Sequence, residues 1–164
     1  MKFAFTALRV VVGGLFVGHG VQKLFGWLGG SGLDATAEGF DSMGIKPGKP
    51  NAIAAGLSEA GGGALLAAGV ATPLAGAALT GTMIQAIRTV HGSKGPWVAE
   101  GGWEYNAVLI AAVLAIVERG PGDFSIDDAA DRDLSGLGWV LFALAGGIAG
   151  PPLLQAALAS FEDA

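Results

Sequence analysis

The sequence predicts an all-α integral membrane protein, a four-helix transmembrane bundle with a fifth, kinked helix at its C-terminus. Charged residues make up only 14% of the 164 residues, against about 25% in soluble domains, so most of the surface needs no contact with water. The 29 glycines suit helices that pack in lipid, where small residues let backbones approach closely. Long apolar runs then mark the individual helices.

The first apolar run extends from about residue 3 to residue 24, which is long enough to span a bilayer. A cleavable signal peptide is the alternative, because Lys2 precedes the run. However, the run is longer than the apolar region of a signal peptide, Arg9 interrupts it, and no small-x-small cleavage site follows. We therefore interpret it as the first transmembrane helix.

The second and third runs, residues 51–70 and 73–90, are separated only by Ala71-Thr72. Pro73 suits the first turn of a helix, so the two runs predict a tight transmembrane hairpin. A fourth span, residues 102–119, reaches sufficient length only if its polar and aromatic start lies at the membrane interface.

A fifth apolar run follows the four predicted spans. Residues 1–127 form the predicted bundle, whereas residues 128–164 form an acidic linker and a fifth helix over about residues 137–158. Gly150-Pro151-Pro152 interrupts this last helix, which is therefore a kinked span, a re-entrant segment or a helix at the interface. We favour the kinked span.

Antiparallel threading places the connections 26–50 and 91–102 on one membrane face. The first connection is long enough for a short amphipathic helix around Ala35–Met43. Lysine and arginine residues occur on both faces, so charge does not set the orientation. Aromatic residues typical of an interfacial belt gather on the face with the two connections: Trp27, Trp97, Trp103 and Tyr105.

Composition excludes several kinds of chemistry. The chain has no cysteine, which rules out disulfides, thiolate nucleophiles and cysteine-ligated metal centres within it. The net charge is −5 and no basic patch is dense enough to bind nucleic acid. His19 alone does not make a metal site, because the chain has only two histidines and no spacing typical of metal ligands.

The predicted spans contain more polar residues than a lipid anchor needs. A charge at mid-bilayer costs at least about 2.5–3.5 kcal/mol, so several charges in one small bundle imply pairing in its interior. At about 100° per residue, Arg9, His19 and Lys23 share one face of the first helix. The polar residues of interest are Arg9, His19, Gln22, Lys23, Glu59, Gln85, Arg88, Glu104 and Tyr105.

These residues predict a polar cavity that opens toward the aromatic belt. Glu59 lies roughly 12 Å from Asn51 along its helix, and Arg9 enters from the opposite side of the membrane. We expect an Arg9–Glu59 ion pair at the floor of the cavity. Lys23 and Arg88 lie near span ends, so snorkelling to the interface is the alternative interpretation of both.

A set of short motifs in order resembles the DoxX family of membrane proteins. The motifs are Arg9 with Gly13-Gly14 and Phe16, His19-Gly20-Val21-Gln22-Lys23-Leu24-Phe25-Gly26, Gly56-x-x-Glu59 with Gly62 and Leu65, Gly69-x-x-Thr72-Pro73, Gly102-x-Glu104-Tyr105, and Gly120-Pro121-Gly122-x-x-Ser125-Ile126-Asp127. They cover about residues 5–127. The resemblance implies a four-helix transmembrane bundle in a prokaryotic plasma membrane, and the family includes a subunit type of thiosulfate:quinone oxidoreductase.

The residues and the resemblance together predict a subunit of a membrane redox system that handles a quinone or a small sulfur oxyanion. Any catalysis would be that of a quinone-linked oxidoreductase, with quinone as the cofactor. The ligand-binding side chains would be Arg9, His19, Gln22, Lys23, Gln85 and Arg88, and proton transfer would fall to Glu59, Glu104 or Tyr105.

Two other functions fit the sequence. The first is a non-enzymatic scaffold that docks a soluble redox enzyme through the connections 26–50 and 91–102. The second is a small transporter or channel, which would need to oligomerise because the chain has few spans and no internal repeat. Besides the bilayer, the expected partners are a soluble redox enzyme, a second membrane subunit or a second copy of the chain.

Overall fold

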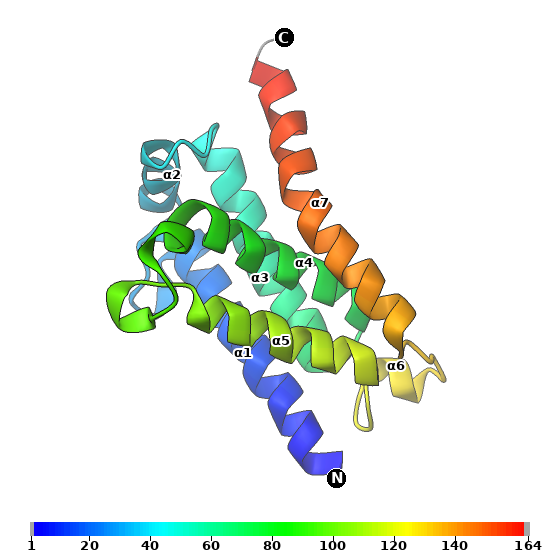
Figure 1. The fold of residues 1–164 in the computed structure, drawn as a ribbon. Coiled ribbons are helices and arrows are strands. Elements are labelled where there is room, and N and C mark those ends of the chain that lie inside the picture. The colour runs from blue at the N-terminus through cyan, green and yellow to red at the C-terminus, as the bar shows by residue number, and fades with distance from the viewer. Residues whose placement is uncertain (1, 163–164) are drawn as a thin grey trace.

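Helices joined by loops, with no strand, make up the described part of the chain, which comprises residues 2–162 of a computed structural model (Figure 1). The predicted all-α class is thereby confirmed for these residues, whereas residues 163–164 of the predicted C-terminal segment lie outside them. The α-helices are α1 (Lys2–Phe25), α2 (Gly32–Ser42), α3 (Gly48–Ala68), α4 (Thr72–Ala86), α5 (Glu104–Arg119), α6 (Ile126–Ala129) and α7 (Leu137–Glu162).

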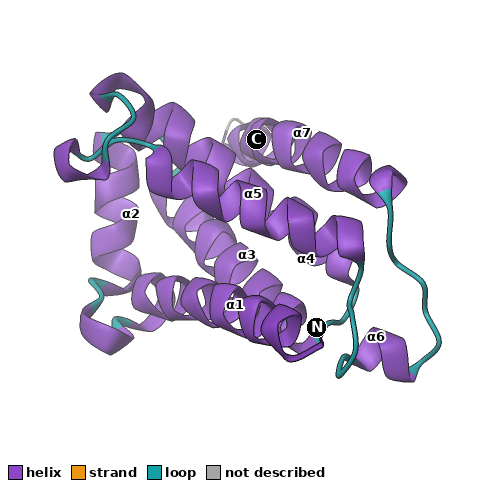
Figure 2. Ribbon diagram, turned by 60° about the horizontal axis from the view of Figure 1, so that its bottom comes forward, coloured by secondary structure: helices purple, strands orange, loops and turns teal. Residues whose placement is uncertain are grey.

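The long helices lie side by side, and short elements cover the two ends of the assembly (Figure 2). Helix α2 lies across one end, where the sequence predicts an amphipathic helix, and it packs against α3. The Asp41 carboxylate accepts a hydrogen bond of 2.8 Å from the Gly48 N–H, so α2 also satisfies an amide at the start of α3. Helix α6 lies at the opposite end (Figure 2).

Two of the helices are long and apolar enough to cross a membrane, over residues Phe3–Phe25 of α1 and Leu137–Leu158 of α7. The other predicted spans fall on α3, α4 and α5. Helix α4 has 15 residues and α5 has 16, which is shorter than the roughly 20 residues that a straight helix needs to span the hydrocarbon core. A five-residue π-helical turn, Ile87–His91, extends α4 to nearly that length.

Burial in this protein follows the pattern of a membrane protein. Large apolar side chains such as Val11, Leu57 and Leu141 are more than half exposed. Charged side chains, by contrast, are buried: Arg9 is 1% exposed, Glu59 is 3% exposed and Asp127 is fully buried. In water, apolar side chains are favoured inside and charged side chains outside. The outer apolar surface of this protein is therefore suited to lipid. The apolar core consists of Val12, Phe16, Leu66, Ala75, Leu79, Met83, Leu109, Val113, Ile116, Val117 and Ala143.

Glycines set the spacing and the register of α1 against α3. A Cβ on Gly20 would lie 2.6 Å from the Ala60 Cβ, and one on Gly13 would lie 2.8 Å from the Ala67 Cβ. Both distances are far below van der Waals contact, so only glycine lets the two backbones approach this closely. The antiparallel register therefore places Gly20 at the level of Ala60, and Gly13 two turns further along at the level of Ala67.

Helix α7 continues through Gly150-Pro151-Pro152, where the sequence suggests a kink or a break. Pro151 and Pro152 have no N–H, so the carbonyls of Gly147 and Ile148 lose their helical partners. Helix α4 and the π-helical turn that follows it lie beside this part of α7. Gly81 packs against Gly147, and the Arg88 guanidinium donates a long hydrogen bond of 3.5 Å to the Ile148 carbonyl. The helix is continuous across the two prolines, and the Ile148 carbonyl has a replacement donor from a neighbouring segment.

Close glycine packing predicts a specific sensitivity to added volume. We expect Gly20→Ala to lower the free energy of unfolding by about 1–3 kcal/mol, because overpacking a tight contact costs about that much. Gly14→Ala is the matched control, since nothing lies within 4 Å of its added Cβ, and should leave stability unchanged or slightly higher. Denaturant unfolding in detergent micelles measures both. Equal stabilities for the two variants would contradict the packing described for α1 and α3.

Candidate functional site

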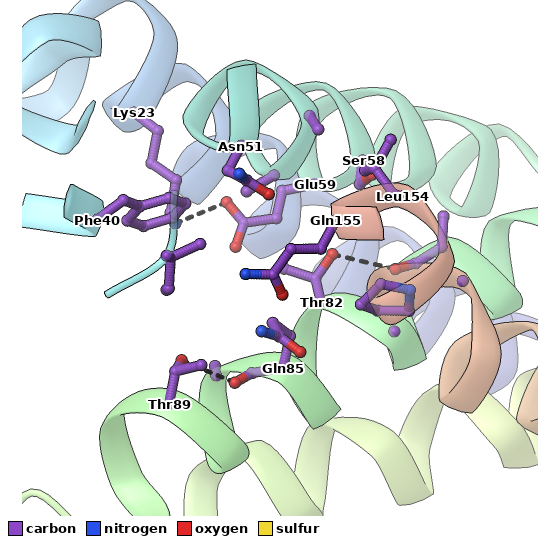
Figure 3. A pocket seen from close by; sticks show the side chains of 18 of the residues that line it. Lys23, Phe40, Asn51, Ser58, Glu59, Thr82, Gln85, Thr89, Leu154 and Gln155 are labelled. Carbon is purple, nitrogen blue, oxygen red and sulfur yellow. Dashed lines mark hydrogen bonds and ion pairs between the residues drawn. The ribbon is translucent and has the colours of Figure 1, made fainter. Parts of the chain in front are cut away.

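A cavity of about 510 Å³ lies between α3, α4 and α7, at the end of the bundle that α2 covers (Figure 3). Its walls are mainly apolar, with small residues of α3 and α4 on two sides and Pro151 and Leu154 of α7 on a third. Phe40 of α2 and Ile45 of the segment that connects α2 to α3 close part of the remaining side. A volume of this size and an apolar lining are typical of sites for small organic molecules.

An ion pair between α1 and α3 forms the charged part of the cavity wall. The Lys23 Nζ lies 2.7 Å from the Glu59 Oε2. The Glu59 side chain is 4% exposed and that of Lys23 is 27% exposed, so the carboxylate is buried and the ammonium is partly open. No described residue donates a hydrogen bond to the second Glu59 oxygen. It is therefore available to a ligand in the cavity.

Uncharged polar side chains complete the lining. Thr82 and Thr89 donate hydrogen bonds to carbonyls one turn earlier in their own helix, at Ala78 and Gln85. The side chains of Ser58, Gln85 and Gln155 line the same cavity. Figure 3 shows Gln85 and Gln155 reaching from α4 and α7 into the space beside Glu59.

The end of α4 winds as a π-helix over Ile87–His91, a rare geometry that often occurs at functional sites. Thr89, Val90 and His91 line the cavity, whereas Arg88 turns toward α7. The His91 Nδ1 lies 2.6 Å from the Gly101 carbonyl oxygen. Because a carbonyl can only accept, Nδ1 carries the hydrogen, and in the neutral ring Nε2 is the acceptor.

The predicted Arg9–Glu59 pair is wrong. Arg9 instead donates to the carbonyls of Pro121 (3.0 Å) and Phe124 (2.9 Å), in the loop that follows α5. The register of α1 against α3 explains this, because Glu59 lies near the level of Gly20, about 16 Å along α1 from Arg9. Arg9 thus fixes a loop at the far end of the bundle, and Lys23 is the residue that reaches Glu59.

The remaining predicted residues do not gather at the cavity. His19 and Arg88 are exposed, and Tyr105 is 42% exposed. Gln22 donates to the Leu28 carbonyl, and Glu104 accepts from the Val98 N–H at 2.7 Å, so both hold loops in place. Of the predicted residues, the structure brings together Lys23, Glu59 and Gln85.

Several lining residues went unnoticed in the sequence although a periodic signal was present. Ser58 follows Asn51 by two turns of α3, and Thr82, Gln85 and Thr89 recur every three or four residues along α4. Each set marks one polar stripe on a helix. Gln155 carried no comparable signal, because its position depends on how α7 packs.

The cavity has no net charge. Lys23 and Glu59 compensate each other, and Arg9 and Arg88 do not line the cavity. Two of the predicted sources of positive potential are therefore outside it. A neutral molecule with polar atoms on an apolar body matches this lining better than an anion, whose desolvation would not be compensated.

Comparison with known proteins adds a family relationship. The model of the DoxX family matches residues 4–92, just over half of the chain. A Bacillus subtilis (strain 168) protein named "Putative oxidoreductase CatD" is 33% identical over 109 residues, which is 66% of this chain and 75% of the relative. No solved structure matches the chain.

The Lys23–Glu59 ion pair predicts how single and double substitutions at these two positions change the free energy of unfolding. Lys23→Met leaves the Glu59 carboxylate without a counter-charge. Since breaking a buried pair costs about 3–5 kcal/mol and Lys23 is partly open, we expect a loss of about 2 kcal/mol. The double variant Lys23→Met/Glu59→Gln should recover part of this loss, because no buried charge remains.

Denaturant unfolding in micelles measures the set, with Lys49→Met as the control. Lys49 pairs with Asp34 at 3.0 Å on the surface, and surface pairs contribute only about 0–1 kcal/mol. A double variant less stable than Lys23→Met alone would contradict the assigned pairing.

Proposed function

The chain belongs to the DoxX family, and we propose that it is a multi-pass subunit of a membrane redox system that binds a quinone. The polar head of the quinone lies in the cavity, beside the Lys23–Glu59 pair. A prokaryotic plasma membrane is the proposed location. The named activity of the similar Bacillus protein supports a redox role.

The lack of net charge in the cavity is the observation that carries this proposal. A quinone is neutral and has carbonyl oxygens on a flat, apolar ring, which agrees with mainly apolar walls and a few hydrogen-bonding side chains. A sulfur oxyanion would need excess positive charge, whereas Glu59 already compensates Lys23. We therefore favour a quinone over an oxyanion as the ligand of this cavity.

Lys23 and Glu59 would have different roles at the polar head of the ligand. The Lys23 ammonium can donate a hydrogen bond to a carbonyl oxygen, and the free Glu59 oxygen can accept a proton from a hydroxyl group. A bound quinone would supply two-electron, two-proton redox chemistry. This chain has no cysteine, so electrons would reach the quinone from a soluble enzyme or a second membrane subunit.

The scaffold hypothesis makes a different prediction for the same residues. A scaffold would need the Lys23–Glu59 pair only to hold α1 against α3, and changes at the cavity would leave its function intact if the fold survives. The binding experiment below distinguishes the two functions. No observation in the structure favours the transporter or channel.

We expect purified protein in lipid nanodiscs to bind decylubiquinone, a quinone with a ten-carbon tail, beyond the amount that empty nanodiscs take up. Lys23→Met/Glu59→Gln should weaken binding about tenfold or more, because hydrogen bonds to charged groups contribute about 1.5–3 kcal/mol. Equilibrium dialysis measures the affinity, with Lys49→Met as the control.

Two results would contradict the proposal. If protein-containing nanodiscs take up no more decylubiquinone than empty ones, the protein does not bind this quinone. Unchanged affinity in the double variant would place the quinone elsewhere on the protein. Displacement of decylubiquinone by millimolar thiosulfate would instead support the oxyanion.

A further inference from the structure

Gln155 is an unusual residue for its position in α7. It is the one polar residue in the run from Pro151 to Leu158, on a helix whose neighbouring Leu153 is 68% exposed. The Gln155 side chain turns away from that exposed surface and lines the cavity instead (Figure 3). If the amide pointed outward, it would lie in lipid with no hydrogen-bond partner, and the inward orientation avoids this.

The inward orientation leaves the Gln155 amide available to a ligand. The Gln155 amide has no hydrogen-bond partner among the described residues, and neither does the side-chain amide of Gln85 on α4. Both side chains are partly exposed, so their amides are accessible from the cavity. Two such amides, from different helices, enter the same cavity beside Glu59 (Figure 3). A ligand with polar atoms would satisfy them.

The packing of α7 fixes which of its faces lines the cavity. Pro151 and Pro152 leave the carbonyls of Gly147 and Ile148 without helical donors. On this side of α7, Gly147 lies against Gly81, and Arg88 donates to the Ile148 carbonyl. Residues two turns beyond Gly147 and on the same face are Leu154 and Gln155. The proline pair and its support from α4 therefore set the rotation that brings Gln155 inward.

We propose that Gln155 is a ligand-binding residue, and that α7 is a wall of the site which sets ligand specificity in this chain. Helix α7 lies outside residues 4–92, the part that the family model matches. The Gln155 amide donates a hydrogen bond to a carbonyl oxygen of the ligand, a contact additional to that of Lys23. The inference rests on the proposed quinone binding and assigns to that site a residue from outside the matched region.

The test measures decylubiquinone binding by full-length protein in nanodiscs. Gln155→Leu keeps the side-chain size but removes the amide, and we expect about fivefold or more weaker binding, which is the loss of one hydrogen bond of about 1 kcal/mol. Leu153→Ala, on the exposed face of the same helix, is the control and should bind as the unmodified protein does. Denaturant unfolding of each variant confirms that the fold is retained.

A second measurement uses the absence of cysteine from the chain. Gln155→Cys and Ser160→Cys each introduce a single thiol, and a small methanethiosulfonate reagent reports its accessibility. Ser160 is exposed and lies on α7 beyond its apolar span, so its thiol would meet water. We expect decylubiquinone to slow the reaction at position 155 at least fivefold and to leave the rate at position 160 unchanged. This result would support the contact even if Gln155→Leu folds poorly.

The outcomes separate this inference from the function on which it rests. If the unmodified protein binds no decylubiquinone, the proposed function and the role of Gln155 both fail. If it binds, but Gln155→Leu binds equally well and the thiol at 155 is unprotected, only the role of Gln155 is overturned. The Lys23–Glu59 site would then stand without α7.

Discussion

A buried carboxylate in an apolar bundle must have a counter-charge, and the Lys23–Glu59 pair is the contact on which the rest of the site depends. Glu59 is almost fully buried, and its desolvation is tolerable only because Lys23 lies 2.7 Å away. That distance requires α1 and α3 to pack closely, which glycines at positions 13 and 20 allow. The same pair leaves the cavity without net charge. It therefore bears both on how α1 packs against α3 and on which ligands suit the cavity.

The helices were largely predictable because their signals are local. The sequence itself shows the apolar runs and the polar connections between them. It also shows Gly69 and Pro73, which mark the end of α3 and the start of α4. The continuity of α7 was not predictable from the chain alone. Pro151 and Pro152 remove helical hydrogen bonds locally, and a replacement donor for the Ile148 carbonyl comes from Arg88 of another segment.

The site was predictable in part, for the same reason. Lys23, Glu59 and Gln85 stand out as polar residues within apolar spans, but their partners depend on interhelical register. Arg9 seemed able to meet Glu59 when only depth from each membrane face was considered. The observed register places the two residues about 16 Å apart along α1, and Gln155 enters the cavity through a rotation of α7 that no local pattern encodes.

The most direct test of this account is the contact between Lys23 and Glu59 in a bilayer. Solid-state NMR on protein with ¹⁵N-labelled lysine and ¹³C-labelled glutamate measures dipolar coupling between the Nζ and the carboxylate carbon. The account predicts a close Lys23–Glu59 contact that disappears in Glu59→Gln. A Glu59 carboxylate that couples to no lysine Nζ, and couples instead to the guanidinium of ¹⁵N-labelled Arg9, would contradict it.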